Sequence, residues 1–343
     1  MSAPADERPR TDVRPVGERS PWSRMVDALA PTLLVVLALV TGSRWVDAPR
    51  SRILPLLQAL VSVAATPTWV VLLATAAARR WRLAGAAGAL AAVHAGRSAA
   101  HAPRRRHRTD AGGGDRLVVL SSNLQHGRGD PTAIVEAVKT RDVDLLLLVE
   151  VTHEAHAGLL EAGIMALLPH ATGRPRTDAR AVMIFSRSPL RSADVPALPP
   201  VGYGAELTAV VTPSGDMIAG VVHPVMPLPG HASRWHRELA DLAVWAASVP
   251  AGVPVVLAGD FNATLDHPVL RRLGDAGFLN AHRNAGRRRL ATWPRVPGLS
   301  RLSPIVQIDH VQVRDLDVVD AGTLVVPGSD HLAVWAELAP AHR

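Results

Sequence analysis

Polar residues able to take part in catalysis stand directly after apolar runs of strand length. Asn123 follows LVVLSS, Glu150 follows DLLLLV and His223 follows MIAGVV, while Asp260 and Asn262 follow VVLAG. In a layered α/β domain the carboxyl ends of the strands line the crevice in which ligands bind. We therefore expect these five side chains to converge on one site.

The donor types favour a hard divalent cation. Mg²⁺ takes few protein ligands, all of them oxygen, and leaves room for water and phosphate in its octahedron. We expect Glu150 to be the main ligand and Asn123 to lie beside it, with Mg²⁺ as the cofactor and Mn²⁺ as a possible substitute. The structural alternative for Glu150 is a solvated strand end.

The remaining residue types suit hydrolysis of a phosphoester. Asp260 can orient or deprotonate a water molecule, and the amide of Asn262 can hold a phosphate oxygen. An unperturbed imidazole titrates near neutrality, so we expect His331 to act as a general acid or base or to bind phosphate. His223 would be a second imidazole on the phosphate. The alternatives are an Asx turn for Asp260 with Asn262, a core histidine for His331 and a capped strand end for His223.

Beyond residue 116 the sequence alternates between short apolar runs and amphipathic helical segments. Runs without polar alternation predict strands that are buried on both faces, and the helices between them supply the cover. The pattern predicts an α/β layered domain. The expected strands are 117–123, 144–150, 181–186, 206–211, 217–223, 253–260, 305–313, 323–326 and 332–338.

Five short motifs carry a resemblance to a known family. They are SSNLQHG, LLVEVT, GDFNAT, QIDHV and SDH, in this order, and HPVMP adds a histidine motif. In order and separation they resemble the motifs of the endonuclease/exonuclease/phosphatase family over residues 117–338. The resemblance implies a DNase I-like four-layer α/β sandwich, with two packed mixed β-sheets flanked by helices. It also implies metal-dependent hydrolysis of phosphoester bonds.

The resemblance assigns roles to further residues. It pairs His331 with Asp309 and places Asp330 near the metal. Family members often have a second acidic or amide residue two positions after the Asn, and here that residue is Gln125, a weaker ligand than a carboxylate. Apart from the resemblance, Arg180 belongs to an arginine cluster before the strand at 181–186 that either contacts substrate phosphate or is solvated.

The first third of the chain differs from the rest in composition. Apolar stretches at 28–43 and 53–78 predict membrane spans, and a marginal third stretch lies at 83–95. Buried helices of a soluble protein are the alternative. We expect four parts: a disordered basic tail (1–24), a membrane region with two or three transmembrane helices (25–100), a linker (101–115) and the catalytic domain (116–343).

Arginine counts favour two spans with a cytoplasmic catalytic domain, whereas family members of this architecture look like three-span proteins with an exported domain. Positive loops stay in the cytoplasm. Two spans would place 13 arginines on the side of the domain against 3 on the other, whereas three spans give 8 against 8. We therefore expect a multi-pass membrane protein whose catalytic domain lies on an undetermined side.

Charge distribution bears on the substrate. The net charge is +7, but residues 1–110 hold 16 arginines against 7 acids, and residues 111–343 hold 21 basic residues against 23 acids. The domain thus lacks the general basic excess that duplex DNA binding favours. A lipid head-group or a small phosphodiester suits it at least as well, and no obligate protein partner is implied. A nonspecific DNA or RNA nuclease and a catalytically silent membrane-tethered binding protein remain as alternatives.

Overall fold

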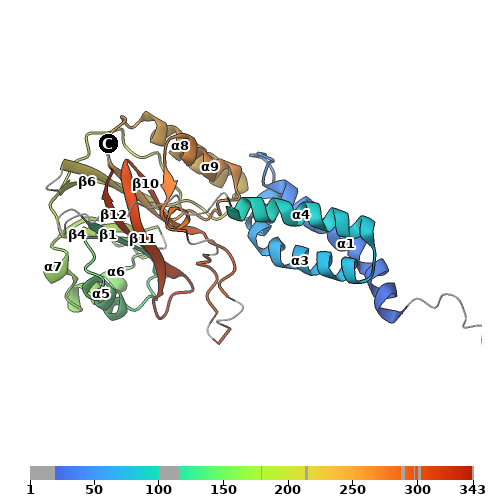
Figure 1. Cartoon of the computed structure of the whole chain (residues 1–343). Coiled ribbons are helices and arrows are strands. Elements are labelled where there is room, and N and C mark those ends of the chain that lie inside the picture. The colour runs from blue at the N-terminus through green and yellow to red at the C-terminus, as the bar shows by residue number, and fades with distance from the viewer. Residues whose placement is uncertain are drawn as a thin grey trace, which may run out of the picture.

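The computed structural model describes residues 20–99, 116–178, 180–212, 215–286, 290–296, 298–299 and 303–341. A bundle of helices at the N-terminal end adjoins a larger two-sheet domain (Figure 1). The predicted linker (101–115) lies outside the described residues, as does the predicted tail up to residue 19.

The domain contains two six-stranded sheets. The first has the spatial order β11 (Leu316–Val325), β12 (Leu332–Pro340), β1 (Leu117–Asn123), β2 (Leu145–Val149), β4 (Val182–Ser186) and β3 (His170–Gly173). The second has the order β5 (Leu190–Arg191), β6 (Gly204–Thr212), β7 (Gly215–His223), β8 (Val255–Asp260), β10 (Asp309–Arg314) and β9 (Leu279–Asn280). Each sheet is mixed, because β1 with β2 and β7 with β8 are parallel pairs and their neighbours pair antiparallel.

Helices cover the outer faces of both sheets. Apolar side chains of the two inner faces form one core between the sheets, and a second and third core lie under the helices. The domain is therefore the four-layer DNase I-like sandwich that the family resemblance implies. The first sheet is covered by α5 (Pro131–Thr140), α6 (His153–Glu161) and α7 (Ile164–Leu167), and the second by α8 (Ala232–Ser248) and α9 (Pro268–Asp275), with α10 (Ala281–Asn284) before β10.

Strand burial explains why the apolar runs predict the sheets well. All five residues of β2 are buried, and so are all six of β8. The strand predicted at 305–313 begins too early, because β10 starts at Asp309. Val306 instead forms an isolated bridge with Trp293. Asp309 thus lies at the first position of its strand, directly opposite Asp260 on β8.

The N-terminal part contains α1 (Pro21–Ser43), α2 (Leu54–Ala59), α3 (Val61–Ala77) and α4 (Trp81–Ala99). The prediction of a disordered tail through residue 24 is wrong for residues 21–24, because α1 begins at Pro21. The Ser20 hydroxyl caps this helix by accepting from the Ser23 N–H at 3.2 Å. A proline is favourable in the first helical turn, because the N–H groups there have no partner within the helix and the N–H that proline lacks is not missed. These two residues together start the helix.

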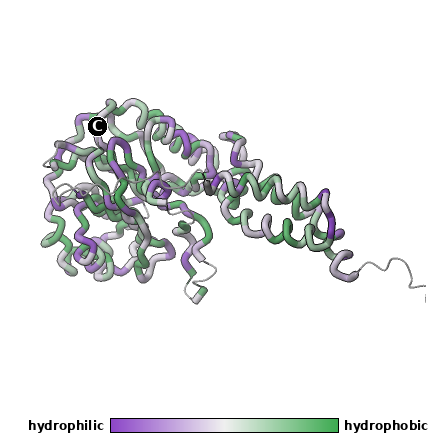
Figure 2. The backbone as a smooth tube through the Cα atoms, in the orientation of Figure 1, coloured by the Kyte–Doolittle hydropathy of each residue, from purple (hydrophilic) through white to green (hydrophobic). Residues whose placement is uncertain are grey.

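Among the described residues, α1 alone is long and apolar enough to cross a membrane. Such a helix near the N-terminus can be an anchor or a signal sequence. The second predicted span is divided between α2 and the 17-residue α3, so a count of two or three spans is not confirmed. The hydropathy of the bundle is nevertheless high along most of its length (Figure 2).

The bundle contacts the domain through the turn that follows β8. Asp266 accepts from Arg44 Nε at 3.3 Å and from Arg97 Nη1 at 2.8 Å. His267 Nε2 lies 2.9 Å from the carbonyl oxygen of Pro55. The ends of α1 and α4 are thereby joined to the domain, and Asp47 after α1 adds ion pairs with His236 on α8 and Arg272 on α9.

Candidate functional site

Asn123 connects the two sheets at the bottom of a buried polar cluster. Its side chain at the end of β1 donates to Glu150 Oε1 at 3.0 Å and to Asp260 Oδ2 at 3.1 Å. All three residues are buried. The carboxyl ends of β1, β2 and β8 therefore bring an amide and two carboxylates together, as the strand-end pattern predicts.

Glu150 adopts a strained backbone conformation that its hydrogen bonds maintain. Its φ is 62°, in the left-handed region that costs a side-chain-bearing residue roughly 1–2 kcal/mol. The carboxylate accepts from the backbone N–H of His126 at 2.6 Å through Oε2. Strain of this kind persists where surrounding contacts fix the conformation, and it is common at functional sites.

Asp260 and Asn262 form an Asx turn at the end of β8. Asp260 Oδ1 accepts from the Asn262 N–H at 2.8 Å, and Asn262 Nδ2 donates to the Pro224 carbonyl at 3.0 Å. Burial, reinforced by the nearby charge of Asp309, raises the pKa of Asp260 to about 7. A carboxyl group with such a pKa exchanges a proton readily near neutral pH.

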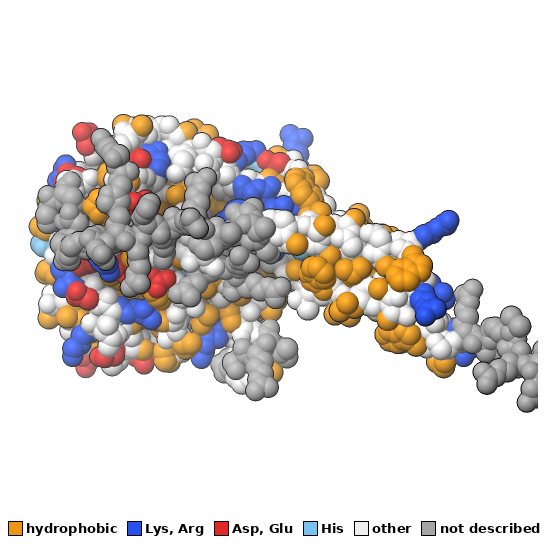
Figure 3. All heavy atoms as spheres, in the orientation of Figure 1, with side chains coloured by type: hydrophobic (Ala, Val, Ile, Leu, Met, Phe, Trp, Pro, Cys, Tyr) orange, Lys and Arg blue, Asp and Glu red, His pale blue; other side chains and the backbone are white. Residues whose placement is uncertain are grey.

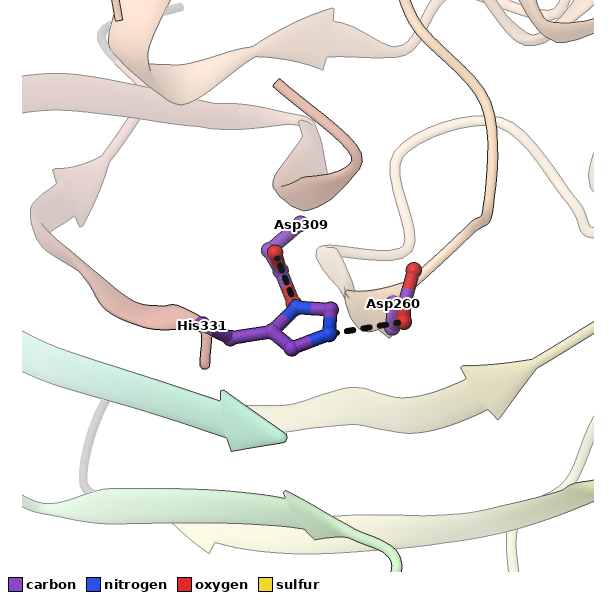
Figure 4. A group of neighbouring side chains, drawn as sticks. All are labelled: Asp260, Asp309 and His331. Carbon is purple, nitrogen blue, oxygen red and sulfur yellow. Dashed lines mark hydrogen bonds and ion pairs between the residues drawn. The ribbon is translucent and has the colours of Figure 1, made fainter. Parts of the chain in front are cut away.

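His331 makes a buried ion pair with Asp309 (Figure 4). The distance from Nδ1 to Asp309 Oδ2 is 2.9 Å, and Nε2 lies 3.9 Å from Asp260 Oδ2. Burial acts to lower the pKa of His331, but Asp309 outweighs it, with help from Asp260 and Asp330, and the pKa rises to about 10. His331 is therefore a cation at neutral pH, with Nε2 directed toward Asp260.

His223 is the second imidazole of the cluster. Its Nε2 lies 3.6 Å from Asp260 Oδ2 and 3.8 Å from Glu150 Oε1. Burial, followed by the neighbouring charge of His331, lowers the pKa of His223 to about 3, so this ring is neutral. No described residue forms a hydrogen bond with its buried Nδ1.

Three predicted residues lie at the edge of the cluster or outside it. Gln125 is half-buried, and its backbone N–H donates to Asn123 Oδ1 at 2.8 Å. Asp330 lies beside His331, with Oδ1 3.8 Å from His331 Nε2, and no described contact joins it to Glu150. Arg180 is exposed, and its described hydrogen bond is one from its own N–H to Asp178.

Sequence reasoning missed residues that hold the cluster together. Ser329 Oγ donates to the Asn123 carbonyl at 2.8 Å and accepts from the His331 N–H at 3.0 Å. Thr292 Oγ1 accepts from the Asp309 N–H at 3.2 Å. The serine of the SDH motif was the available signal for Ser329, whereas nothing around Thr292 marks it in the sequence.

The donor set fits a hard divalent cation. Glu150 offers a buried carboxylate beside that of Asp260, and a cation between such groups would offset their mutual repulsion. Asp260, Asp309 and His331 also present atoms within 4.8 Å of one another that could hold a metal ion. The Glu150 carboxylate is the better ligand, because a protonated imidazole has no lone pair to give and Asp309 already binds the ring.

A comparison with protein-family models decides the assignment. The model of the endonuclease/exonuclease/phosphatase family matches residues 120–331. The chain belongs to this family. Its members hydrolyse phosphoester bonds. The matched segment runs from β1 to His331 and so contains every residue of the cluster.

Solved structures of the endonuclease/exonuclease/phosphatase fold resemble the chain at low sequence identity. A family protein from Beutenbergia cavernae is 20% identical with a TM-score of 0.50, and the match covers 66% of this chain and 72% of that one. D. rerio TDP2 in complex with a single-strand DNA product is 12% identical with a TM-score of 0.51, covering 65% and 98%. The human Nocturnin catalytic domain with bound sulfate is 17% identical with a TM-score of 0.50, covering 66% and 95%. A search of curated proteins finds no match.

Proposed function

We propose that the protein is a membrane-anchored, divalent-metal-dependent phosphodiesterase. The observation that carries the proposal is the buried contact of Asp260 with the His331–Asp309 pair, beside the carboxylate of Glu150. A proton-accepting carboxyl group, a fixed cation and a metal ligand are the parts that phosphoester hydrolysis requires. Phosphomonoesters are a second substrate type that the same parts could serve.

Asp260 is the group placed to handle the attacking water. Its raised pKa makes it a base of suitable strength near neutral pH, and the Asn262 N–H and the Asn123 amide fix its two oxygens. The bond from an aligned water to the phosphorus would form as the ester bond on the opposite side breaks, and Asp260 would accept the proton of that water.

The two imidazoles would stabilise the negative charge on the phosphate. His331 carries a positive charge set by Asp309, so its Nε2–H can donate to a phosphate oxygen. Neutral His223 can donate through one nitrogen only, and its Nε2 already faces the carboxylates. A hydrogen bond to phosphate therefore needs less rearrangement of His331 than of His223.

Glu150 would hold the metal, with Gln125 as a weaker contact, and Asn123 would position the carboxylate, because it turns its Nδ2 donor toward Glu150 while its Oδ1 accepts from the Gln125 N–H. Bound Mg²⁺ or Mn²⁺ would supply a Lewis acid that neutralises charge on the phosphate oxygens. The chain's own contribution is to fix Glu150 through the His126 N–H and the Asn123 amide before a cation arrives.

The bundle supports a membrane anchor because large apolar side chains cover its surface as well as its interior. Outward-facing side chains of α1 and α3 are large and apolar, including Leu39 and Leu73, which are 64% and 68% exposed. Polar Thr41 is buried and lies 3.1 Å from His94 Nε2. An apolar outer surface of this kind is expected in lipid and unfavourable in water. Figure 3 shows hydrophobic side chains over the bundle surface between basic residues at its two ends.

Among the described helices only α1 is both long and apolar enough to cross the membrane by itself, and we infer that α3 and α4 cross beside it. At 1.5 Å per residue, helices of 17 to 23 residues span about 26–35 Å, close to the hydrocarbon thickness of about 30 Å. Helix α1 ends beside the domain, α3 leads away from it and α4 returns (Figure 1). The start of α1 and the catalytic domain would then lie on opposite sides of the membrane.

Hydrolysis by the purified full chain tests the proposed activity. In detergent with Mg²⁺ or Mn²⁺, turnover of bis-p-nitrophenyl phosphate should disappear with EDTA and fall by about two orders of magnitude or more in Asp260→Ala. Asp241→Ala is the matched control, because Asp241 is exposed on α8. Equal activity in both variants, or turnover that EDTA does not affect, would exclude the mechanism.

A nuclease is the second candidate. A structure of the same fold, that of D. rerio TDP2, holds a single-strand DNA product. Including single-stranded DNA among the substrates would distinguish the two candidates: a kcat/KM for DNA far above that for small diesters and phospholipids would favour the nuclease. A silent binding protein would show no turnover on any of them in a folded chain.

A further inference from the structure

A segment at the edge of the active site exposes an unusual number of large apolar side chains. The described residues of 292–305, here called the rim segment, include Trp293, Val296, Leu299 and Ile305, which are 36%, 40%, 50% and 45% exposed. Single exposed apolar residues need no explanation, but a group of them on one segment marks a contact surface.

The rim segment borders the active site directly. Trp293 Nε1 donates to Asp330 Oδ2 at 3.1 Å, and its ring centroid lies 6.4 Å from that of His331. The Arg295 N–H donates to the Asp330 carbonyl at 2.6 Å, and Arg295 Nη1 donates to the Ser329 carbonyl at 3.3 Å. A surface that touched this segment would lie at the entrance of the site.

The active site is also close to the end of the bundle. Asp266, which binds Arg44 and Arg97 at the ends of α1 and α4, follows Asp260 by six residues. Six residues span at most about 20 Å, so the Cα atoms of Asp260 and Asp266 lie within that distance of each other. In Figure 1 the segment between α10 and β10 hangs downward from the edge of the domain that faces the bundle.

We propose that the rim segment rests on the surface of the bilayer that holds the bundle, so that the site takes a phosphoester from the lipid head-group layer. The inference rests on the proposed function and names its substrate class. Trp293 suits the interface because tryptophan favours the head-group level, and Arg295 adds a positive charge that attracts anionic head-groups. The apolar tips of Val296 and Leu299 would enter the outer part of the acyl layer.

A probe placed on the rim segment tests the contact without requiring activity. The chain contains no cysteine, so one engineered thiol labels a single site. Leu299→Cys is labelled with a fluorophore in the full chain, reconstituted in phosphatidylcholine–phosphatidylglycerol nanodiscs containing a lipid with a head-group quencher. Leu160→Cys on α6 is the matched control, because Leu160 is 45% exposed and α6 lies away from the bundle.

The expected result is quenching of the Leu299 probe about threefold or more stronger than that of the Leu160 probe, because interfacial side chains enter the head-group layer by several ångströms. Equal quenching at both positions would overturn the inference. A Leu299 signal that depends on the number of chains per disc, and not on the quencher lipid, would assign the segment to a second copy and would also overturn it.

Turnover on two substrates links the contact to catalysis. In Val296→Ser/Leu299→Ser, hydrolysis of a vesicle phospholipid should fall about tenfold while that of bis-p-nitrophenyl phosphate stays unchanged, because only the bilayer contact is weakened. Leu160→Ser should change neither rate. An equal loss on both substrates would contradict the inference. If the wild-type chain hydrolyses neither, the proposed function fails, and the probe still decides the bilayer contact.

Discussion

Replacing Asp309 by Asn tests how the charge of His331 is set. The carboxylate lies 2.9 Å from His331 Nδ1. At an effective dielectric constant of about 20, unit charges at this separation attract by roughly 6 kcal/mol, or about four pKa units. The pKa of His331 is about 10 with Asp309 present. In Asp309→Asn it should therefore fall to near its unperturbed value of about 6.5.

The assay is the dependence of kcat on pH with bis-p-nitrophenyl phosphate and saturating Mg²⁺. If protonated His331 binds the phosphate, the alkaline limb lies near pH 10 in the wild type and moves to near 6.5 in Asp309→Asn. At about pH 8.5 the variant would hold roughly one protonated His331 in a hundred, which predicts a loss in kcat of about a hundredfold. At about pH 6 most of the rings remain protonated and the loss should be below tenfold.

Stability provides an independent readout with a defined sign. The folded pKa of His331 is raised, so its contribution to stability is fully present below the unfolded value of about 6.5 and is lost as the pH rises through about 10. The difference in melting temperature between wild type and Asp309→Asn should therefore be largest near pH 6 and should shrink at alkaline pH.

Asp330→Asn is the matched control for this experiment. Asp330 also acts to raise the pKa of His331, but less than Asp309 does, and its side chain is 32% exposed. The alkaline limb of the kcat profile should therefore shift less in Asp330→Asn than in Asp309→Asn. An alkaline limb that stays near pH 10 in folded Asp309→Asn would refute the reasoning, since either Asp309 would not set the charge of His331 or that charge would not be required.

Four further predictions follow from individual contacts. Glu150→Gln should raise the Mg²⁺ concentration for half-maximal activity about tenfold or more, measured by metal titration; an unchanged titration would place the metal elsewhere. Ser329→Ala removes two buried hydrogen bonds and should cost roughly 1–3 kcal/mol in thermal unfolding together with a loss in kcat, so a purely thermal effect would deny it a positioning role. Asp266→Asn leaves two mostly buried arginines without their anionic partner; limited proteolysis should then separate the bundle from the domain more readily, and unchanged cleavage would contradict the junction. Burial lowers the pKa of His310 to about 4, so its contribution of roughly 3 kcal/mol is present above about pH 6.5 and is lost as the pH falls through about 4; a melting temperature that is flat over that window would be inconsistent with it.

The sequence by itself determined the layered fold and the strand ends that carry chemistry. Strands buried on both faces appear as unbroken apolar runs, so β1, β2 and β8 were predicted within two residues of their ends. Asn123, Glu150 and Asp260 follow those runs and converge as expected, because the parallel pairs in each sheet bring the strand ends to one edge. Short strands such as β5 and β9, of two residues each, leave no pattern to detect.

Tertiary structure decided the arrangement and charge of the site. The proximity of Asn123 to Asp260, 137 residues apart, depends on the packing of one sheet on the other. The same packing buries His331 beside Asp309 and raises the pKa of His331 to about 10, whereas the pKa of buried His223 is lowered to about 3. No local pattern distinguishes two histidines whose ionisation is set by desolvation and by charges from distant segments.

The relation of the bundle to the domain also required the tertiary structure. Composition indicated apolar helices, but it could not show that Thr41 is buried beside His94, or that Asp266 joins the ends of α1 and α4 to the turn after β8. Local periodicity reports which residues avoid water, and that preference is satisfied equally by a protein core and by lipid. Which of the two covers a given apolar face depends on contacts between segments far apart in the chain, and these exist only once the chain has folded.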